Sequence, residues 1–301
     1  MAKQPRSLAG KVAVVTGGGR GIGKAISRSL GREGVRVAIA DLDASVAEAA
    51  AAETGAGAIG LALDVTDRPA FTAALDRIEQ ELGPIEIVVN NAGIMPIGPF
   101  EEETDATAIR QLELNLHAVI HGSKEAVRRM KPRGTGHIVN VASVAGKTGF
   151  PNLATYCAAK HGVVGLSEAL RIELRGSGVD VSVVMPAIVR TELAAGLQPS
   201  RGFKPSTPEA VAEAVVAALQ ENRFDVFVPR AIGPTWAGMN LIPRRAREAL
   251  ARALHFDRAL RDTDRSARAA YEARAAASAP AADAVIAEAA AEPEARAHAA
   301  A

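Results

Sequence analysis

Two patterns of apolar and polar residues alternate along the first three quarters of the chain. Short runs rich in Val, Ile and Ala end in Gly, Asn or Asp, and longer stretches with apolar residues at helical spacing lie between them. Unbroken apolar runs of this length are typical of parallel strands that are buried on both faces. We expect strands at residues 11–16, 35–40, 58–63, 85–89, 137–141, 179–185 and 224–228. We expect helices at residues 24–34, 44–54, 67–82, 104–130, 154–175 and 209–222.

Strands that alternate with helices in this way predict a fold of the α/β class. The expected architecture is a Rossmann-type doubly wound parallel sheet of about seven strands, with helices on both faces. Residues 1–228 are expected to form one domain of this fold. Residues 229–301 are rich in Arg and Ala, and we expect a helical or partly disordered C-terminal extension there.

The extension begins with a basic stretch at residues 244–261, where six arginines stand against Glu248 and Asp257 for a local charge of +4. Its apolar residues follow helical spacing, so a basic amphipathic helix is expected. Such a helix can pack on the domain or on a partner subunit, which we favour because alanine buries little area. The alternative is weak association with an anionic membrane surface. Residues 264–301 are about half alanine, which fits a loose helix or a disordered segment.

Composition narrows the class of protein. The formal net charge of the 301 residues is +1, which argues against a general nucleic-acid-binding protein. One cysteine, Cys157, rules out an intrachain disulfide and a cysteine metal cluster, and we expect it to be a small buried apolar residue. The chain begins with polar residues, and no stretch approaches the ~20 apolar residues of a membrane span. We therefore expect a cytoplasmic protein with no transmembrane segment.

A glycine-rich turn follows the first expected strand. Glycines at positions 17, 21 and 23 precede a helical pattern, so backbone N–H groups at the helix start can face a pyrophosphate. Asp41 ends the next strand, 20 residues beyond Gly21, where a carboxylate can accept a hydrogen bond from a ribose 2′-hydroxyl. Its charge would repel a 2′-phosphate, so NAD is favoured. Arg20 could partly offset that charge, which leaves NADP possible.

Other polar residues stand at the ends of later strands. Asp64 and Val65 follow the third strand, where an adenine would lie in such a sheet, although Asp64 could instead cap the next helix. Asn90 and Asn91 follow the fourth strand, and each could either satisfy strand-end backbone groups or hold a ribose.

His117 and His121 are four residues apart on a helix. Without an obvious third ligand they are interpreted as structural, so no metal site is expected.

Tyr156 and Lys160 are four residues apart and lie on one face of an expected helix. A phenol ordinarily titrates near pH ~10, which is too high for a general base at neutral pH. A nearby ammonium favours the phenolate and lowers the pKa of the phenol. The pair is therefore a candidate proton donor and acceptor. The spacing alone is a weak pattern, because it also describes a surface lysine beside a buried tyrosine.

Taken together, these residues resemble the short-chain dehydrogenase/reductase superfamily over about residues 11–228. Thr16-Gly17-x-x-x-Gly21-Ile22-Gly23 is similar to its cofactor loop, and Asn90-Asn91-Ala92-Gly93 is similar to its strand-four motif. Ser143 stands 13 residues before Tyr156, as in that family. The departure from the family pattern is Ala187, where glycine is usual after proline. The resemblance implies a catalytic tetrad of Asn115, Ser143, Tyr156 and Lys160.

The resemblance also implies the reaction: hydride transfer between a nicotinamide cofactor and a secondary alcohol or ketone. Tyr156 would take the hydroxyl proton, Ser143 would orient the substrate oxygen, and Lys160 would lower the Tyr156 pKa and hold the nicotinamide ribose. Asn115 would anchor a water that links Lys160 to solvent. The cofactor-binding residues so expected are Gly17, Arg20, Gly21, Ile22, Gly23, Asp41, Asp64, Val65, Asn91, Tyr156, Lys160, Val189 and Thr191, with Val189 and Thr191 at the carboxamide.

Partners follow from the same resemblance. The substrate is expected to be a small alcohol or ketone of apolar character, because Leu193, Leu197 and Phe203 lie in a loop at residues 190–208 that is interpreted as a substrate lid. A homodimer or homotetramer is expected through the helices at 104–130 and 154–175. Two other classes share this fold: isomerases, epimerases or dehydratases that keep NAD bound, and non-enzymatic dinucleotide sensors. The first usually has a different glycine spacing, and the second tends to lack the tyrosine or lysine.

Overall fold

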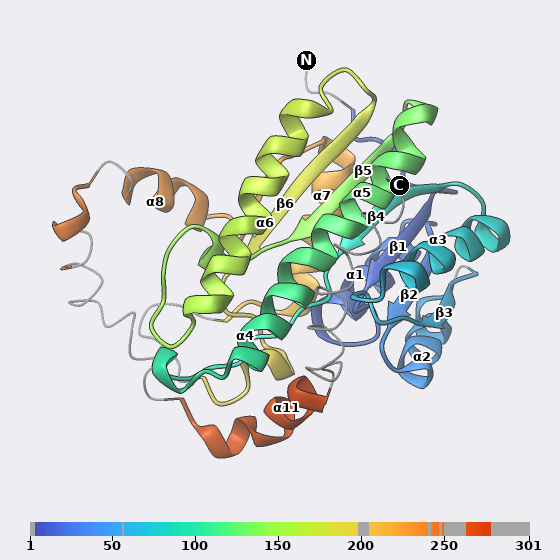
Figure 1. Cartoon of the computed structure of the whole chain (residues 1–301). Helices are drawn as coiled ribbons and strands as arrows, with labels where there is room; N and C mark the ends of the chain where they lie inside the picture. Colours follow the sequence, from blue (N-terminus) through green and yellow to red (C-terminus); the bar gives the residue numbers. More distant parts are fainter. Residues whose placement is uncertain are drawn as a thin grey trace, which may run out of the picture.

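The computed structural model describes residues 4–55, 57–197, 205–239, 242–246, 249 and 263–277. Within them, a seven-stranded parallel sheet runs in the order β3-β2-β1-β4-β5-β6-β7 (Figure 1). Its strands are β1 Val12–Thr16, β2 Arg36–Asp41, β3 Ile59–Ala62, β4 Ile85–Asn90, β5 Gly136–Val141, β6 Val179–Pro186 and β7 Asp225–Val228. The expected doubly wound sheet is thus confirmed.

The helices connect the strands and cover both faces of the sheet. They are α1 Gly21–Arg32, α2 Ala44–Thr54, α3 Arg68–Leu82, α4 Asp105–Leu112, α5 Ala118–Met130, α6 Ala154–Glu173, α7 Pro208–Glu221, α8 Ile232–Met239 and α11 Arg265–Ala277. Short turns are η1 Phe100–Glu102, the π-helical η2 Glu113–His117, η3 Lys131–Arg133, η4 Val144–Gly146 and η5 Glu192–Ala194.

The direction in which strands are added to the sheet reverses next to β1. The chain moves outward from β1 to β2 and β3, then returns to form β4 on the other side of β1. In such sheets, ligands bind beyond the carboxyl ends of the strands, where the order reverses. The residues that follow β1, β2 and β4 therefore meet at one end of the molecule.

Alternation along each strand divides the core into two layers. In β1, Ala13 and Val15 pack in the layer that contains α1, α2 and α7, while Val12 and Val14 pack in the layer that contains α3 and α5. Because successive side chains of a strand point to opposite faces, unbroken apolar runs are needed when both faces are covered. This is why the strands could be recognised in the sequence.

The expected helix at residues 104–130 has the predicted extent but an irregular centre. Thr104 accepts a hydrogen bond from Thr107 N at 3.2 Å and so caps α4. Regular α-helical turns then give way to the π turn η2, and α5 follows without a break. A π turn accommodates an extra residue and often lies at a functional site. Asn115 occupies this turn.

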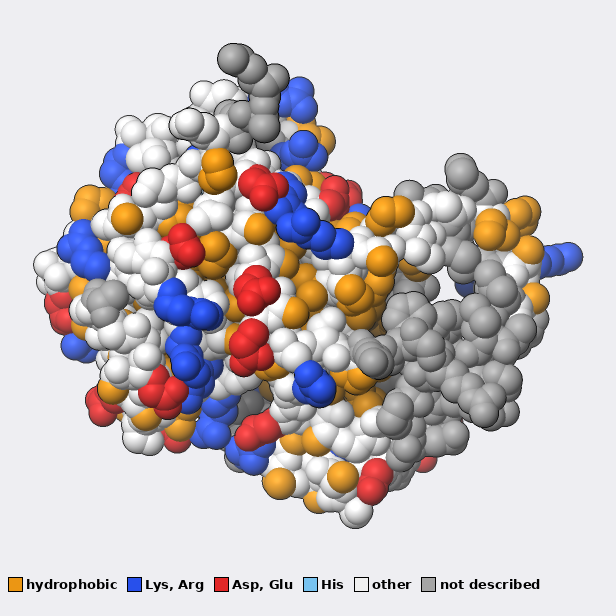
Figure 2. Space-filling view, turned by 180° about the vertical axis from the view of Figure 1, so that it is seen from behind, with side chains coloured by type: hydrophobic (Ala, Val, Ile, Leu, Met, Phe, Trp, Pro, Cys, Tyr) orange, Lys and Arg blue, Asp and Glu red, His pale blue; other side chains and the backbone are white. Residues whose placement is uncertain are grey.

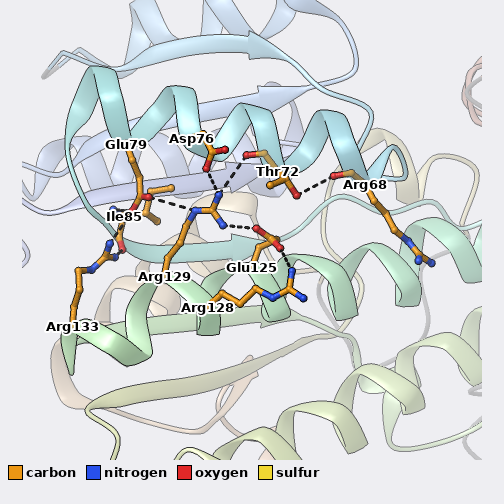
Figure 3. Close-up of polar contacts among 9 residues, drawn as sticks. All are labelled: Arg68, Thr72, Asp76, Glu79, Ile85, Glu125, Arg128, Arg129 and Arg133. Carbon is orange, nitrogen blue, oxygen red and sulfur yellow. Dashed lines mark hydrogen bonds and ion pairs between the residues drawn. The ribbon is translucent and has the colours of Figure 1, made fainter. Parts of the chain in front are cut away.

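Helix α5 is held against α3 by charged side chains (Figure 3). Arg129 of α5 makes ion pairs with Asp76 of α3 and with Glu125 of its own helix, and its Nε lies 3.4 Å from Glu79 Oε2. Arg133 Nη1 donates to Glu79 Oε1 at 2.8 Å. A guanidinium with several acceptors holds its geometry better than a single exposed pair. These contacts fix α5, and with it the position of η2.

Both histidines of this segment contact other side chains. The His121 ring lies edge-on to Phe71, with 5.1 Å between the ring centroids. His117 Nδ1 and Glu113 Oε1 are 2.8 Å apart on the same helical face. In the part of the chain that the structure describes, His, Cys, Asp and Glu side chains form no group of three that could hold a metal ion.

Helix α11 lies in the segment for which a loose helix or disorder was expected. It is helical, it packs on the domain through Ala275, and its Arg268 is buried. Most of the expected basic helix at 244–261, and all of residues 278–301, lie outside the described residues. No described helix is both long enough and apolar enough to cross a membrane. The boundary between two domains at residue 228 stays a prediction.

The surface carries both signs of charge. Figure 2 shows acidic and basic side chains interspersed on the face opposite to that of Figure 1, with apolar side chains between them. This distribution agrees with the formal net charge of +1 over the whole sequence.

Candidate active site

The turn between β1 and α1 requires glycine. Gly17 and Gly21 have φ values of +58° and +48°, which side chains with a Cβ rarely adopt. A Cβ on Gly23 would lie 2.1 Å from the Gly17 carbonyl oxygen, so the start of α1 packs directly on the end of β1. The sequence spacing reflects two different needs: conformation at Gly17 and Gly21, and close packing at Gly23.

The first turn of α1 is open to an anion. Its N-cap residue, Arg20, makes no side-chain hydrogen bond to the helix, and the first turn contains no acidic residue. The N–H groups of that turn are unpaired within the helix, and the helix dipole favours negative charge there. This set of donors fits the pyrophosphate of a dinucleotide.

Asp41 stands beside this turn at the end of β2. Its Oδ2 accepts a hydrogen bond from Gly19 N at 2.9 Å. The guanidinium of Arg20 lies instead 3.8 Å from Asp43 Oδ2, the carboxylate that caps α2. Arg20 is therefore turned toward a different carboxylate, and Asp41 keeps its negative charge facing the glycine turn.

Asp64 and Val65 follow β3 at the same end of the sheet. Asp64 Oδ1 accepts from Thr66 N at 2.9 Å and from Thr66 Oγ1 at 2.7 Å. The N-cap of α3 is Asp67, which accepts from Ala70 N, so the alternative that Asp64 caps this helix is wrong. Val65 is buried. Asp64 thus shapes a turn, and its Oδ2 lies 3.9 Å from Arg110 Nη2.

The two asparagines after β4 both brace the backbone or the core. Asn90 is buried and donates to Asn140 Oδ1 at 2.8 Å. Asn91 Nδ2 donates to Thr16 O at 2.9 Å and to Gly17 O at 3.1 Å, which joins the end of β4 to the glycine turn. Asn90 therefore has a structural role, which was one of the two alternatives for it. Asn91 holds the turn that a cofactor would contact.

Thr16 belongs to the motif that resembles the cofactor loop, and its side chain braces the backbone. Its Oγ1 accepts hydrogen bonds from Asn91 N at 3.0 Å and from Ala92 N at 3.2 Å. The hydroxyl itself donates to Val89 O at 3.3 Å. The signal in the sequence is a lone polar residue at the end of an apolar strand, directly before glycines. A hydroxyl there ties β1 to β4 at the point where the strand order reverses.

The four residues of the expected tetrad converge from three elements. Ser143 follows β5, Tyr156 and Lys160 lie on α6, and Asn115 lies in η2. Lys160 Nζ is 5.6 Å from the centroid of the Tyr156 ring, and a hydrogen bond links Tyr156 to Ser143. Lys160 Nζ also donates to Val141 O at 2.9 Å. The hydroxyl of Tyr156 and its neighbours thus lie together at the carboxyl end of β5.

Asn115 joins this group through the loop after β4. Its Nδ2 donates to Ile94 O at 2.9 Å, and its Oδ1 accepts from Ile94 N at 3.0 Å. A Cβ on Gly93 would lie 2.5 Å from Asn115 Oδ1 and 3.7 Å from Lys160 Nζ. Gly93 therefore lies between the asparagine and the lysine, and a side chain there would clash with the asparagine while making ordinary contact with the lysine.

Burial controls the protonation of Tyr156 and Lys160. Burial raises the pKa of the Tyr156 phenol well above its usual value, and the hydrogen bond to Ser143 opposes this only in part. Burial also lowers the pKa of Lys160 to about 8. Lys160 Nζ lies 5.6 Å from the centroid of the Tyr156 ring and donates to a main-chain carbonyl. The expectation that Lys160 lowers the Tyr156 pKa stays a prediction, and burial of the phenol favours its protonated form.

The loop after β6 brings Val189 and Thr191 to the glycine turn. Val189 is buried and bridges to Ser206, and Thr191 Oγ1 donates to Val189 O at 3.4 Å. A Cβ on Gly21 would lie 3.3 Å from Thr191 Cγ2, so the two segments are in contact. Ala187 continues the sheet, because its N–H donates to Val228 O at 2.9 Å. The loop after β6 thus lies against the glycine turn, while the Arg20 guanidinium lies beside Asp43.

Apolar residues surround the Tyr156 phenol. A buried cluster contains Met95, Leu153, Tyr156 and Cys157, and side chains of the η5 segment pack against it. Leu193 and Leu197 are among these, whereas Phe203 lies outside the described residues. Cys157 is buried, as predicted.

Two residues of α11 reach this site and were missed in the sequence. Tyr271 Oη accepts a hydrogen bond from Met95 N at 2.7 Å, and Arg268 is 2% exposed. The available signal was Tyr271 itself, one of two tyrosines in the chain and the single Phe, Trp or Tyr in the alanine-rich residues 264–301. An isolated aromatic residue in such a segment indicates a docking contact.

Comparisons with known proteins agree with this geometry. The family model described as short chain dehydrogenase matches residues 11–202. The 2-(S)-hydroxypropyl-CoM dehydrogenase 3 of Xanthobacter autotrophicus is 37% identical over 253 residues, which cover 78% of this chain and 98% of that protein. The D-threitol dehydrogenase of Mycolicibacterium smegmatis is 42% identical over 189 residues, 62% of this chain and 73% of that protein.

A solved structure is similar as well. It is a short-chain dehydrogenase/reductase from Burkholderia phymatum in complex with NAD, with a TM-score of 0.71, 29% identity, and coverage of 77% of this chain and 93% of that chain. The chain belongs to the short-chain dehydrogenase/reductase family. It is an oxidoreductase of that family with a site for a nicotinamide cofactor.

Proposed function

We propose that this protein interconverts a secondary alcohol and a ketone by hydride transfer, with Tyr156 as the general acid and base. The observation that carries the proposal is the convergence of the Tyr156 hydroxyl, Ser143 and Lys160 at the end of the sheet where the glycine turn is open to an anion. When bound, the nicotinamide supplies or accepts the hydride. The chain supplies the position of the substrate and the proton.

Each residue of the group has a distinct proposed task. In the reductive direction, the Tyr156 hydroxyl donates its proton to the carbonyl oxygen of the substrate, and Ser143 donates a hydrogen bond to the same oxygen. The protonated phenol favoured by burial is the form that this direction requires. In the oxidative direction, Tyr156 must first lose its proton, and the Lys160 ammonium then stabilises the phenolate. Asn115 holds the backbone of Ile94 and thereby positions the wall beside Lys160.

The proposed cofactor is NAD rather than NADP. The Asp41 carboxylate lies beside the glycine turn, and the Arg20 guanidinium lies 3.8 Å from Asp43 instead. A carboxylate there accepts from a ribose 2′-hydroxyl and repels a 2′-phosphate. We include Gly17, Gly21, Ile22, Gly23, Asp64, Val65, Asn91, Val189 and Thr191 in the proposed cofactor site, with Arg20 at its edge.

The proposed substrate is a small apolar alcohol or ketone. The apolar cluster around the phenol includes Met95, Leu153 and Leu193. A pocket of this kind selects by size and shape, and its few polar groups fix orientation.

We also propose a homodimer or homotetramer. Large apolar side chains are exposed on the relevant surfaces, with Ile109 of α4 at 41% and Ile172 of α6 at 65% exposure. Burial of these two side chains between subunits would favour association. Light scattering at micromolar concentration tests this, and the mass of a single subunit would contradict it.

The reaction is tested by screening the purified protein with NAD and with NADP against secondary alcohols and ketones, while following the absorbance of the reduced nicotinamide. Turnover of a secondary alcohol or its ketone, lost in Tyr156→Phe, is the expected result. A protein that binds NAD but shows no turnover with any alcohol or ketone would favour a sensor or a non-redox enzyme instead.

A further inference from the structure

Helix α11 crosses the loops that surround Tyr156. Figure 1 shows α11 at the end of the molecule farthest from the N-terminus, on the same side as α4. The Tyr156 side chain sits beneath the loops that follow β4 and β6, and its residue is 7% exposed. Tyr156 lies on α6, and apolar residues of the loops after β4 and β6 pack against it.

Arg268 fastens α11 to both of these loops. Its Nη2 donates to Met95 O at 2.6 Å, in the loop after β4. Its Nη1 donates to Leu193 O at 2.9 Å and to Ala195 O at 3.0 Å, in the loop after β6. Nε donates to Glu272 Oε1 at 2.9 Å. A buried guanidinium is stable only when its donors are paired, and here three of the acceptors are main-chain carbonyls of the two loops.

A backbone contact supports the same arrangement. Asp264 N donates to Gly196 O at 2.9 Å. Gly196 has a φ of +72°, and a Cβ there would lie 2.4 Å from Asp264 O. The loop after β6 therefore has a glycine at the point where the tail chain approaches most closely.

Tyr271 fills the space between Arg268 and the active-site loop. Its Oη accepts from Met95 N at 2.7 Å, and the Arg268 guanidinium lies 4.9 Å from its ring centroid. Burial raises its pKa to about 12, so the phenol is neutral at ordinary pH. Met95, which it contacts, packs in the same apolar cluster as Tyr156.

We propose that α11 is the roof of the substrate site, and that Tyr271 is a specificity-determining residue that Arg268 positions. This inference rests on the proposed reaction. The ring of Tyr271 limits the size of the substituent that an alcohol or ketone can place above the reacting carbon. The site so formed takes compact apolar secondary alcohols and excludes bulky ones.

Specificity is measured with full-length variants. Tyr271→Ala removes the ring, so the ratio of kcat/KM for a bulky aryl alcohol to that for 2-propanol should rise roughly tenfold or more, the range typical of a change in pocket size. Tyr271→Phe keeps the ring and should move this ratio by less than about threefold. NAD affinity, measured by titration, should change little in either variant, because α11 contacts the loops on the substrate side.

The role of Arg268 in positioning Tyr271 is tested by comparing Arg268→Met with the control Arg274→Met. Both change an arginine of α11, but Arg274 pairs at the surface with Glu192 at 2.6 Å, and both side chains are at least half exposed. Arg268→Met should shift the specificity ratio in the same direction as Tyr271→Ala, while Arg274→Met should not. Gly196→Ala disturbs the contact from the loop side and should resemble Arg268→Met, which keeps the test usable if the latter folds poorly.

A second readout needs no turnover. Cys157 is the single cysteine of the chain and lies buried in the cluster beneath the roof. Its rate of alkylation by iodoacetamide should rise about tenfold or more in Arg268→Met and in Gly196→Ala, since burial slows thiol reaction. Arg274→Met should match the parent. Melting temperatures distinguish local opening from general unfolding.

The two proposals fail in different ways. If the parent turns over no alcohol or ketone, the proposed function is wrong, and the roof is still judged by Cys157 alkylation. If the parent is active but Tyr271→Ala leaves the specificity ratio unchanged, Tyr271 does not determine specificity. If Arg268→Met and Arg274→Met alkylate at the same rate as the parent, α11 does not cover the site, and the inference is overturned.

Discussion

The two halves of the active site are built in different ways. The part of the proposed cofactor half at the ends of β1 and β2 depends on local backbone: Gly17 and Gly21 have positive φ, and Asp41 accepts from Gly19 N. The substrate half is assembled from distant segments, because Arg268 contacts Met95 and Leu193 across sequence separations of 173 and 75 residues. Local backbone conformation shapes the cofactor half, and contacts between distant segments shape the substrate half.

The difference separates what a family shares from what one member adds. A glycine turn that must bind a common cofactor is fixed by the chemistry of phosphate and backbone. A roof made by a tail helix can change without disturbing that turn, since its contacts lie on loops after β4 and β6. Fold and cofactor are therefore weak guides to substrate, and the site itself must be examined.

The largest effect is expected at the residue that both halves serve. Tyr156→Phe removes the transferable proton, so kcat should fall roughly a thousandfold, within the range of general acid–base catalysis. The ring and its packing remain, and NAD binding should be nearly unchanged in a fluorescence titration. Activity within about tenfold of the parent would contradict the proposed mechanism.

The next effect tests the cofactor half alone. Asp41→Ala removes an acceptor for the ribose hydroxyl, and loss of a hydrogen bond to a charged group should weaken NAD binding by roughly tenfold or more. NADP binding should improve at the same time. The ratio of the two dissociation constants measures the effect, and Asp43→Ala is the control on the neighbouring carboxylate. A parent that binds NADP more tightly than NAD would make the assignment of Asp41 wrong.

The tail contact should have a smaller effect on stability. Gly196→Ala places a Cβ at a positive φ and against Asp264 O, so the free energy of unfolding should fall by about 1–2 kcal/mol. Denaturant unfolding gives this value. Gly149→Ala, where a Cβ would meet nothing within 4 Å, is the control. Equal loss in both variants would mean that α11 adds no local constraint.

The smallest effect concerns pH and links the two halves. Burial lowers the pKa of Lys160 to about 8, so its positive charge is lost as the pH rises through that value. If the ammonium holds the nicotinamide ribose, NAD affinity should fall a few-fold between about pH 7 and pH 9. Lys160→Met should bind more weakly throughout and lack this dependence. A parent whose affinity is flat over the same range would argue against the ribose contact.

Much of the fold could be predicted from the sequence because β1 and the other strands are unbroken apolar runs that end in glycine or polar residues. The positions of Tyr156, Lys160 and Ser143 followed from spacing and resemblance. The protonation of Tyr156 could not be predicted, because it depends on burial, which spacing does not report. The Arg20–Asp43 pair was hidden for a similar reason, as two exposed side chains had several choices of partner.

Arg268 shows the other limit. In the sequence it is one arginine among many in an alanine-rich tail, and helical spacing would place it on a solvated face. Its burial results from three carbonyl oxygens offered by loops that lie far away in the chain. A local pattern cannot reveal acceptors that only the folded loops present.

The π turn η2 also determines which side chains of α5 face the sheet. One residue added to a helix turns the following part by about 100° about its axis. In this structure α5 presents Gly122 to Asn90, where a Cβ would lie 2.2 Å from Asn90 Oδ1. Deleting a residue from η2 would bring a larger side chain to that place and carry Asn115 away from Ile94. Length at this point of the chain is thus as constrained as residue type, and a one-residue deletion should disable both helix packing and the catalytic group together.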